Sequence, residues 1–293
     1  MPSPEFTGTP LRRFQYEAIL GFFVQSEPPT TYLPRRPPAF GLKEYASPTR
    51  WRDLKDRVDL LQRSAPEDTR YIVCWLARHG QAWHNCATTF RDNSSTPEWD
   101  NQTADPPLTP LGEDQAKAMN KLWKAELQRS EDPIPLPTKL FCSPLSRALA
   151  TMELTFGEFL LDNATVRTPD KRPLVLEGLR EVLSPFTHDK RSSKVEILVQ
   201  FPGVQIESSF TEEDELWDDT ISESDSLLKA RVKSTLDYIF GDCLESTDNC
   251  VSITTHSGVA MMILHLVGHR ILPLRLGGVI PLVIRVTGDC GVE

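Results

Sequence analysis

The chain has 293 residues, of which 39% are hydrophobic and 25% charged, with 15 Gly, 24 Pro and 6 Cys. These proportions exclude collagen-like, low-complexity and disulfide-scaffold classes. The apolar stretch 257–268 is shorter than the roughly 20 apolar residues that span a bilayer, and the first residues lack the pattern of a signal peptide. Since scattered cysteines suit a reducing compartment, we expect a cytoplasmic protein, with the nucleus as a second location, and no membrane partner.

The net charge of −9 is unevenly distributed along the chain. Ten acidic residues and no Lys or Arg lie between 195 and 228, so the rest of the chain is close to neutral. A nucleic-acid partner is disfavoured, because such proteins usually carry a basic face. The acidic stretch is expected to be a solvated loop or helix face, with a lid over a pocket as the alternative.

The first 68 residues differ in character from the rest. Nine of the 24 prolines lie in the first 50 residues, and segment 28–41 is typical of extended chain without a core of its own. A helix is predicted over 51–62, where Trp51, Leu54 and Val58 share one face. We therefore expect an irregular N-terminal extension, 1–68, packed on a catalytic domain, 69–293.

Strand and helix patterns alternate after residue 70. Apolar runs predict strands over 71–77, 139–143, 173–179, 250–255 and 279–286, whereas helical periodicity predicts helices over 112–128, 144–160, 224–240 and 257–268. The second of these helices is expected to start at Pro144, because proline suits a first helical turn. The alternation indicates an α/β fold with a mostly parallel sheet, which binds ligands at the carboxyl ends of its strands.

Polar residues follow four of these strands at the point where each strand ends. They are Arg78 and His79, Ser143 and Arg147, the segment from Glu177 to Glu181, and His256. Each alone has an ordinary explanation: a junction or capping histidine, a solvated arginine, a surface carboxylate. Because parallel strands bring these ends to one edge, the joint arrangement predicts a site containing two His, two or three Arg and one or two Glu.

Five motifs occur together in one order: LARHGQAWHN (76–85), LTPLGEDQA (108–116), CSPLSRALAT (142–151), LREVL (179–183) and TTHSGVA (254–260). On these motifs, residues 71–290 resemble the histidine phosphatase superfamily, the phosphoglycerate-mutase-like group. FTHDKRSS (186–193), EEDELWDD (212–219), FGL (40–42) and TRWRDL (49–54) further resemble its fungal and plant phosphomutase-like branch. The resemblance implies a three-layer α/β/α sandwich that needs no cofactor and no metal.

The resemblance also implies a role for each residue of the site. His79 would be the nucleophile that forms a phosphohistidine, and Glu181 the general acid and base, with Glu177 as the fallback. The phosphoryl group and the substrate would be bound by Arg78, Asn85, Arg147, Arg180, His188, Arg191 and His256. Adjacent arginines should keep His79 neutral and nucleophilic near neutral pH.

Departures from the branch lie where the substrate pocket is expected. Phe186 stands where the branch has His, His188 where it has Cys, Ser184 where Gly is usual and Ser192 where an Arg is expected. Phosphate handling is therefore predicted to be intact, whereas the substrate stays open. An apolar position at 186 would suit a less polar substrate.

Three functions fit these residues. The leading interpretation is a phosphatase acting on a small phosphomonoester. A phosphomutase would use the same site, but the substrate-loop pattern of true mutases is not found. A non-catalytic phospho-ligand sensor is the third. The pair His265 and His269 has a metal-ligand spacing without an evident third ligand, and Ser143 lacks a nucleophile elbow, so neither is assigned a role. The oligomeric state is left open.

Overall fold

The computed structural model describes residues 14–28, 37–87, 103–161 and 172–288. Its strands are β1 (Phe14–Ala18), β2 (Thr69–Arg78), β3 (Lys139–Cys142), β4 (Leu174–Val175), β5 (Gln205–Ile206), β6 (Cys250–Thr255) and β7 (Val279–Gly288). Its α-helices are α1 (Arg50–Arg63), α2 (Trp83–Ala87), α3 (Pro110–Leu127), α4 (Ser146–Phe156), α5 (Lys194–Gln200), α6 (Asp225–Gly241) and α7 (Ser257–Leu266). The strands form one sheet in the order β1-β7-β2-β6-β3-β4-β5.

The sheet is mostly parallel, as predicted. The described strands β2, β6, β3, β4 and β5 pair in parallel, and β7 lies antiparallel to both β2 and β1. The parallel register aligns Arg78 with Thr255 and Cys142 with Thr254. The carboxyl ends of β2, β6 and β3 therefore meet at one edge, where the polar residues of the motifs follow.

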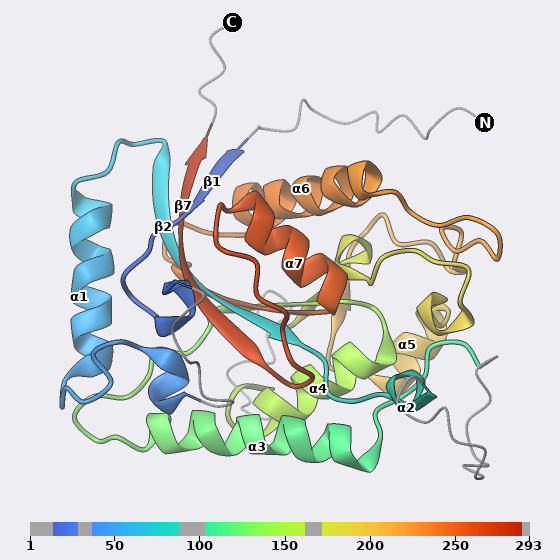
Figure 1. The fold of residues 1–293 in the computed structure, drawn as a ribbon, viewed down its shortest axis with the longest axis horizontal. Coiled ribbons are helices and arrows are strands. Elements are labelled where there is room, and N and C mark those ends of the chain that lie inside the picture. The colour runs from blue at the N-terminus through green and yellow to red at the C-terminus, as the bar shows by residue number, and fades with distance from the viewer. Residues whose placement is uncertain (1–13, 29–36, 88–102, 162–171, 289–293) are drawn as a thin grey trace, which may run out of the picture.

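Helices cover both faces of the sheet, which gives the three-layer α/β/α sandwich (Figure 1). Helices α1, α3 and α4 bury side chains such as Trp51, Trp123 and Leu149 against one face. Helices α6 and α7 bury side chains such as Val232 and Ile263 against the other. Because β2 and β6 are covered on both faces, their sequences are nearly continuous apolar runs.

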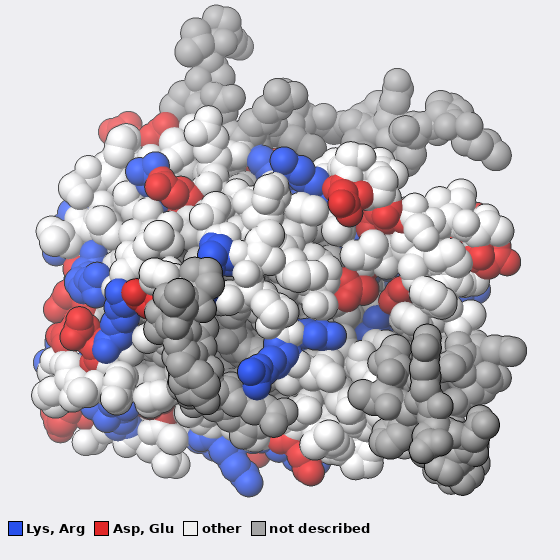
Figure 2. All heavy atoms as spheres, viewed as in Figure 1, with Lys and Arg blue, Asp and Glu red and all other residues white. Residues whose placement is uncertain are grey.

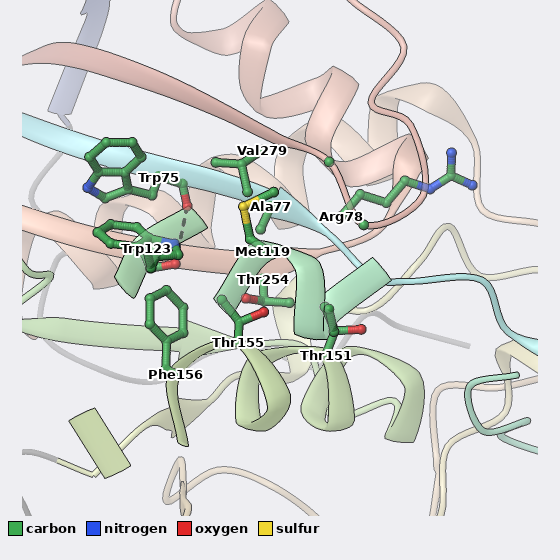
Figure 3. Close-up of a pocket in the computed structure, with 14 residues that line it drawn as sticks. Trp75, Ala77, Arg78, Met119, Trp123, Thr151, Thr155, Phe156, Thr254 and Val279 are labelled. Atoms are coloured by element: carbon green, nitrogen blue, oxygen red, sulfur yellow. Dashed lines mark hydrogen bonds between the residues drawn. The ribbon is translucent and has the colours of Figure 1, made fainter. Parts of the chain in front are cut away.

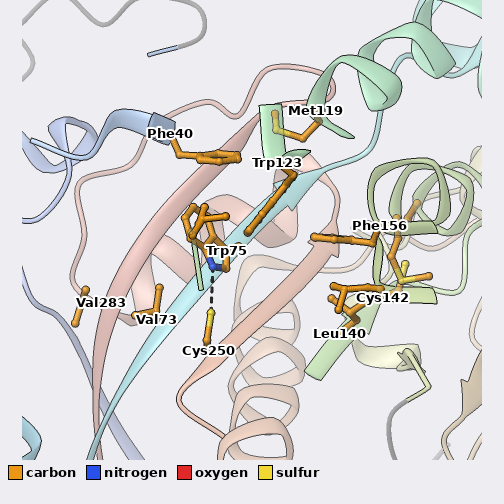
Figure 4. Close-up of a cluster of buried hydrophobic side chains, with 14 of the residues drawn as sticks. Phe40, Val73, Trp75, Met119, Trp123, Leu140, Cys142, Phe156, Cys250 and Val283 are labelled. Carbon is orange, nitrogen blue, oxygen red and sulfur yellow. Dashed lines mark hydrogen bonds between the residues drawn. The ribbon is translucent and has the colours of Figure 1, made fainter. Parts of the chain in front are cut away.

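The described part of the N-terminal extension belongs to the core rather than lying over it. Strand β1 pairs with β7 and closes one edge of the sheet. In the 3-10 turn η2 (Pro38–Gly41), Phe40 packs with ring centroids 5.0 Å from Trp75 and 4.9 Å from Trp123 (Figure 4). The predicted helix over 51–62 is confirmed as α1, whereas most of the predicted extended segment, residues 29–36, lies outside the described ranges.

Several element boundaries differ from the predicted ones. Helix α4 begins at Ser146, not at Pro144, because Leu145 has an extended backbone with ψ of 131° and ends the helical geometry there. The free Ser146 amide of the first turn donates to the Asp105 carboxylate 2.8 Å away. The helix then passes into a single π-helical turn over 157–161. Strand β4 has two residues, shorter than the predicted 173–179. The short elements β1, β5, α2 and α5 were not predicted, since each has too few residues to show a period.

The acidic stretch is not only a solvated surface. Glu207 accepts a hydrogen bond from the Glu177 backbone amide. Asp214 accepts from Arg180, and Glu223 accepts from Arg231. The side chain of Asp214 is nearly inaccessible to solvent. On the face drawn in Figure 2, Lys and Arg side chains are interspersed with Asp and Glu. Within the described ranges, no helix is both long enough and apolar enough to cross a membrane.

Candidate active site

His79 lies directly after β2, and its side chain is 1% exposed. Its Nδ1 is 2.6 Å from the Gly80 carbonyl oxygen. Because a carbonyl can only accept, Nδ1 carries the proton and Nε2 keeps its lone pair. Burial, together with the positive charges of Arg147 and Arg78, holds the pKa of His79 well below its ordinary value. The imidazole is therefore neutral at physiological pH.

Two glycines and a threonine fix the chain around His79. The Gly80 amide donates to Thr151 Oγ1 of α4, 2.9 Å away. A Cβ on Gly80 would lie 2.4 Å from the Gly112 carbonyl oxygen, and a Cβ on Gly112 would lie 2.0 Å from the Gln81 carbonyl oxygen. Only glycine allows this approach, so the turn that carries His79 is tied to the first turn of α3 and to α4.

The two arginines each keep donors unpaired. Arg78 Nη1 donates to the Leu274 carbonyl, and Arg147 donates through Nη1 to the His188 carbonyl and through Nη2 to Asp189 Oδ1. The Nε of both arginines is buried without a hydrogen-bond partner. Burying such a donor is costly unless a ligand completes it. The two guanidinium groups thus provide donors for an anion.

His256 precedes α7 and lies beside His79, with ring centroids 4.9 Å apart. Its Nε2 is 2.7 Å from Ser143 Oγ, and its Nδ1 is buried without a partner. Burial and the Arg147 charge hold its pKa well below the ordinary value. Ser143, which follows β3, therefore orients the His256 imidazole through this hydrogen bond.

The structure adds His84 to the cluster. Its ring centroid lies 5.8 Å from that of His79. Asn85 Oδ1 accepts from the Ala82 amide, so its Nδ2 faces His84 Nε2, 2.9 Å away, and donates to it. His84 Nδ1 then carries the proton, and this atom is buried without a partner. Sequence reasoning missed this role, because a histidine near the start of a five-residue helix has no characteristic pattern.

The unpaired donors are concentrated at this site. Seven buried side-chain nitrogen or oxygen atoms lack a hydrogen-bond partner among the described residues. Four of them belong to the cluster: the Nε of Arg78 and Arg147 and the Nδ1 of His84 and His256. Such a concentration around a neutral histidine is typical of a pocket that binds an anion.

Glu181 approaches the cluster from the segment after the 3-10 turn η5 (Glu177–Leu179). Its Oε1 accepts from the amides of Val182 and Gly258, each 3.0 Å away. Burial raises its pKa, against the lowering effect of these hydrogen bonds and of Arg147. The raised pKa suits a carboxyl that must both give and take a proton.

Arg180, Arg191 and Glu177 are bound to one another instead of lining the His79 cluster. Arg180 is fully buried and donates to Glu177, to both carboxylate oxygens of Asp214 and to the Asp189 carbonyl. Arg191 forms an ion pair with Glu177, 2.9 Å away, and donates to three carbonyls of 211–213. Arg180 and Arg191 were predicted to contact the substrate, but the hydrogen bonds that they form in the structure are to other groups of the protein. Glu177 is the carboxylate that they share.

His188 and Phe186 extend the cluster toward solvent. The His188 ring stacks on His84 with centroids 4.7 Å apart and on Phe186 with centroids 5.3 Å apart, both nearly parallel. Phe186 is 65% exposed. Ser192 donates to Asp105, and Ser184 donates to Asp189. The positions that depart from the branch pattern therefore all belong to one segment beside the cluster.

A small cavity lies behind the end of β2 (Figure 3). Trp75, Met119 and Thr155 are among its lining residues, and the Arg78 guanidinium points away from it. It does not include His79 or Glu181. In the described part of the chain, no group of three or more His, Cys, Asp or Glu side chains is arranged to hold a metal ion.

The motifs match a known family. The pattern of the histidine phosphatase superfamily (branch 1) matches residues 74–274, more than half of the sequence. The chain belongs to the histidine phosphatase superfamily. It is 35% identical over 298 residues to a protein of Arthroderma benhamiae named "Probable phosphoglycerate mutase", with 92% of this chain and 84% of that protein covered.

A second fungal relative has the same extent. The "Phosphomutase-like protein 3" of Candida albicans is 32% identical, with 93% of this chain and 80% of that protein covered. Among solved structures, the phosphoglycerate mutase of Thermus thermophilus is 21% identical over 72% of this chain and 92% of that chain, with a TM-score of 0.39. The fungal relatives extend across the N-terminal extension as well as the superfamily domain.

Proposed function

We propose that the protein is a phosphatase that hydrolyses a small phosphomonoester through a phosphohistidine on His79. The observation that carries the proposal is a set of three unpaired buried donors, on Arg78, Arg147 and His84, together with the partnerless Nδ1 of His256, around a neutral imidazole whose Nε2 is free of its proton. A phosphoryl group supplies the acceptor oxygens that these donors lack. Membership of a superfamily of phosphatases and mutases supports the same chemistry.

In the first step, His79 Nε2 attacks the phosphorus atom and the bond to the ester oxygen breaks. Glu181, protonated because of its raised pKa, gives its proton to the leaving alkoxide. Arg78, Arg147 and His256 bind the phosphoryl oxygens throughout. The proton on His79 Nδ1 stays hydrogen-bonded to the Gly80 carbonyl, which stabilises the positive charge that develops on the phosphorylated ring.

In the second step, a water molecule attacks the phosphohistidine. Glu181, now a carboxylate, accepts the water proton, and the P–N bond breaks to regenerate neutral His79. Inorganic phosphate leaves. Division into two displacements replaces one difficult step by two easier ones.

A phosphomutase is the second candidate, favoured by the names of the fungal relatives. It would return the phosphoryl group from His79 to another hydroxyl of the same product before release. The departures at Phe186 and His188 favour hydrolysis, because they leave an apolar ring at the mouth of the site where a mutase needs polar contacts to retain its product. A sensor without turnover is the third.

Phosphate release from a panel of phosphomonoesters, compared between wild type and His79→Ala, tests the proposal. We expect turnover in wild type and loss of nearly all of it in the variant, whereas Tyr45→Ala, which is 48% exposed and lies outside the five motifs of the site, serves as the control. Equal turnover in wild type and His79→Ala would reject the nucleophile. Isomerisation without free phosphate would identify a mutase, and ligand-dependent melting without turnover a sensor.

A further inference from the structure

We propose that Asp189 is a positioning residue that fixes the Arg147 guanidinium in the His79 cluster, and that the buried ion pairs around Arg180 hold Asp189 in place. The inference rests on the proposed function, since it assigns Arg147 to the phosphoryl group. It gives a purpose to the segment 184–192, which departs from the branch pattern, and to the acidic stretch that contains Asp214.

Asp189 ends the 3-10 turn η6 (Thr187–Asp189) and is 4% exposed. Its Oδ1 accepts from Arg147 Nη2 at 3.3 Å, and its Oδ2 accepts from Ser184 Oγ at 2.5 Å. The neighbouring His188 carbonyl accepts from Arg147 Nη1 at 2.7 Å. Two acceptors on consecutive residues thus define the plane of the guanidinium. Its Nε stays free for a ligand.

The backbone that carries Asp189 is held from the opposite side. Arg180 Nη2 donates to the Asp189 carbonyl at 2.7 Å, and Arg180 forms an ion pair with Asp214 at 2.6 Å. The Arg191 amide donates to the same Asp214 carboxylate at 2.9 Å, and the Arg191 side chain pairs with Glu177. Buried ion pairs of this kind need good geometry to be tolerated, and that geometry restricts the segment to one arrangement.

A second carboxylate joins the same segment to the helix that carries Arg147. Asp105 accepts from the Ser146 amide and hydroxyl at the start of α4. The same Asp105 accepts from the Ser192 hydroxyl at 2.7 Å. Asp105 therefore connects the segment 184–192 to the first turn of α4. This connection keeps Asp189 and Arg147 in a fixed position relative to each other.

Asp189 could instead serve only to balance a buried positive charge, and the two roles predict different behaviour. A charge-balancing residue affects folding, and its loss lowers stability without changing the chemistry. A positioning residue changes how well Arg147 meets a phosphoryl oxygen. A displacement of about 1 Å at such a group can cost on the order of 10²-fold in rate.

The experiment compares Asp189→Asn with a matched control, Asp132→Asn. Asp132 is 3% exposed and accepts from the amides of Trp51 and Arg52 at the start of α1. Both variants remove one buried carboxylate charge while keeping the shape of the side chain. We expect Asp189→Asn to lower kcat/KM by about 10- to 100-fold and to weaken binding of inorganic phosphate, measured by calorimetry. Asp132→Asn should lower the melting temperature and leave both values unchanged.

Phosphate binding is the readout that a purely structural role would not move, and the pH profile reports the negative charge of Asp189 separately. The charged groups that act on Glu181 are Arg78, Arg147 and Asp189, with the Arg231 guanidinium on its main-chain carbonyl. Asp189 itself faces Arg147 and His188. Its negative charge raises the pKa of Glu181, so its removal lowers that pKa. Activity that needs protonated Glu181 should then be lost at a lower pH in Asp189→Asn and at an unchanged pH in Asp132→Asn.

The outcomes separate the inference from the proposed function. Wild-type turnover with unchanged kcat/KM and phosphate binding in Asp189→Asn would overturn the inference and leave the phosphatase in place, whether or not the pH profile shifts. Absence of wild-type turnover would reject the proposed function, and phosphate calorimetry of the two variants would still decide the positioning role. Equal losses in both variants would assign Asp189 to stability alone.

Discussion

A single carbonyl oxygen decides which nitrogen of His79 keeps its lone pair and would attack phosphorus in the proposed reaction. The Gly80 carbonyl accepts the hydrogen bond from Nδ1–H, and burial beside two arginines prevents a second proton from binding. Glu181 is the complement, because burial raises its pKa and keeps a proton available. One environment thus shifts a base and an acid in the directions that their proposed roles need.

Gly258 offers the sharpest test at this scale. A Cβ there would lie 2.4 Å from Val182 Cγ2 and 2.7 Å from Glu181 Oε1, so Gly258→Ala displaces the carboxylate from its two amides. We expect kcat for an alkyl phosphate to fall by about 10²-fold or more, as on loss of a general acid, with inorganic phosphate still bound. Steady-state kinetics and calorimetry measure the two effects.

Gly203→Ala is the control, since a Cβ there meets no atom within 4 Å. It should match wild type in both measurements. A normal kcat in Gly258→Ala would remove Glu181 from the proposed mechanism.

At the scale of elements, the stack of His84, His188 and Phe186 leads from the site to solvent. It joins helix α2 to the turn η6, two elements that lie about a hundred residues apart in the sequence. The outer ring lies beside the acidic segment, because Trp217 Nε1 donates to the Phe186 carbonyl. A leaving group that extends past the phosphoryl site therefore meets aromatic surface.

Phe186→Ala should lower kcat/KM for 2-naphthyl phosphate by about 2- to 10-fold, the value of one aromatic pair, and leave glycerol 2-phosphate unchanged. The difference between the two substrates is the measured quantity, and it should come from KM. Leu60→Ala, which removes a side chain of similar exposure on α1, should alter neither. Equal losses for both substrates would show that the ring does not contact the leaving group.

The sequence predicted the long elements and most of the site, since motifs at strand ends and helical periods are local signals. The carboxylates that pair with Arg180 and Arg191 could not be predicted from the sequence. An arginine in a motif can bind a substrate or a carboxylate equally well, and here the carboxylate of Asp214 lies 34 positions further along the chain from Arg180. Asp105 accepts from the first turn of α4 in the same long-range way. The predicted start at Pro144 was wrong because Leu145 is extended.

At the scale of the whole molecule, the N-terminal extension contributes to the core through its described residues. Phe40 and its neighbour Ala39 adopt left-handed backbone conformations, with φ of 56° and 45°, which place the phenyl ring against both Trp75 and Trp123. Non-glycine residues persist in that region only where the surrounding packing determines them. The sequence predicted an N-terminal extension, but it did not predict that Phe40 packs into the core. A few proline-rich residues carry no periodic pattern from which such packing could be recognised.

Phe40→Ala should lower the free energy of unfolding by about 3–5 kcal/mol, because it leaves a cavity among large aromatic rings. Denaturant unfolding measures this change. The exposed Tyr45→Ala should stay within about 0.5 kcal/mol of wild type. A similar small change for Phe40→Ala would mean that the extension adds little to the stability of the core.

The aromatic cluster under the sheet also gives the protein an optical signal of its own. Trp51 and Trp123 lie with ring centroids 6.2 Å and 4.8 Å from Trp75, and Trp75 belongs to β2, the strand that His79 directly follows. Indoles fixed this closely in an asymmetric setting give near-ultraviolet circular dichroism that is lost when tertiary packing is lost. Docking of the extension can therefore be followed spectroscopically on the unlabelled chain, from within the strand that carries the nucleophile.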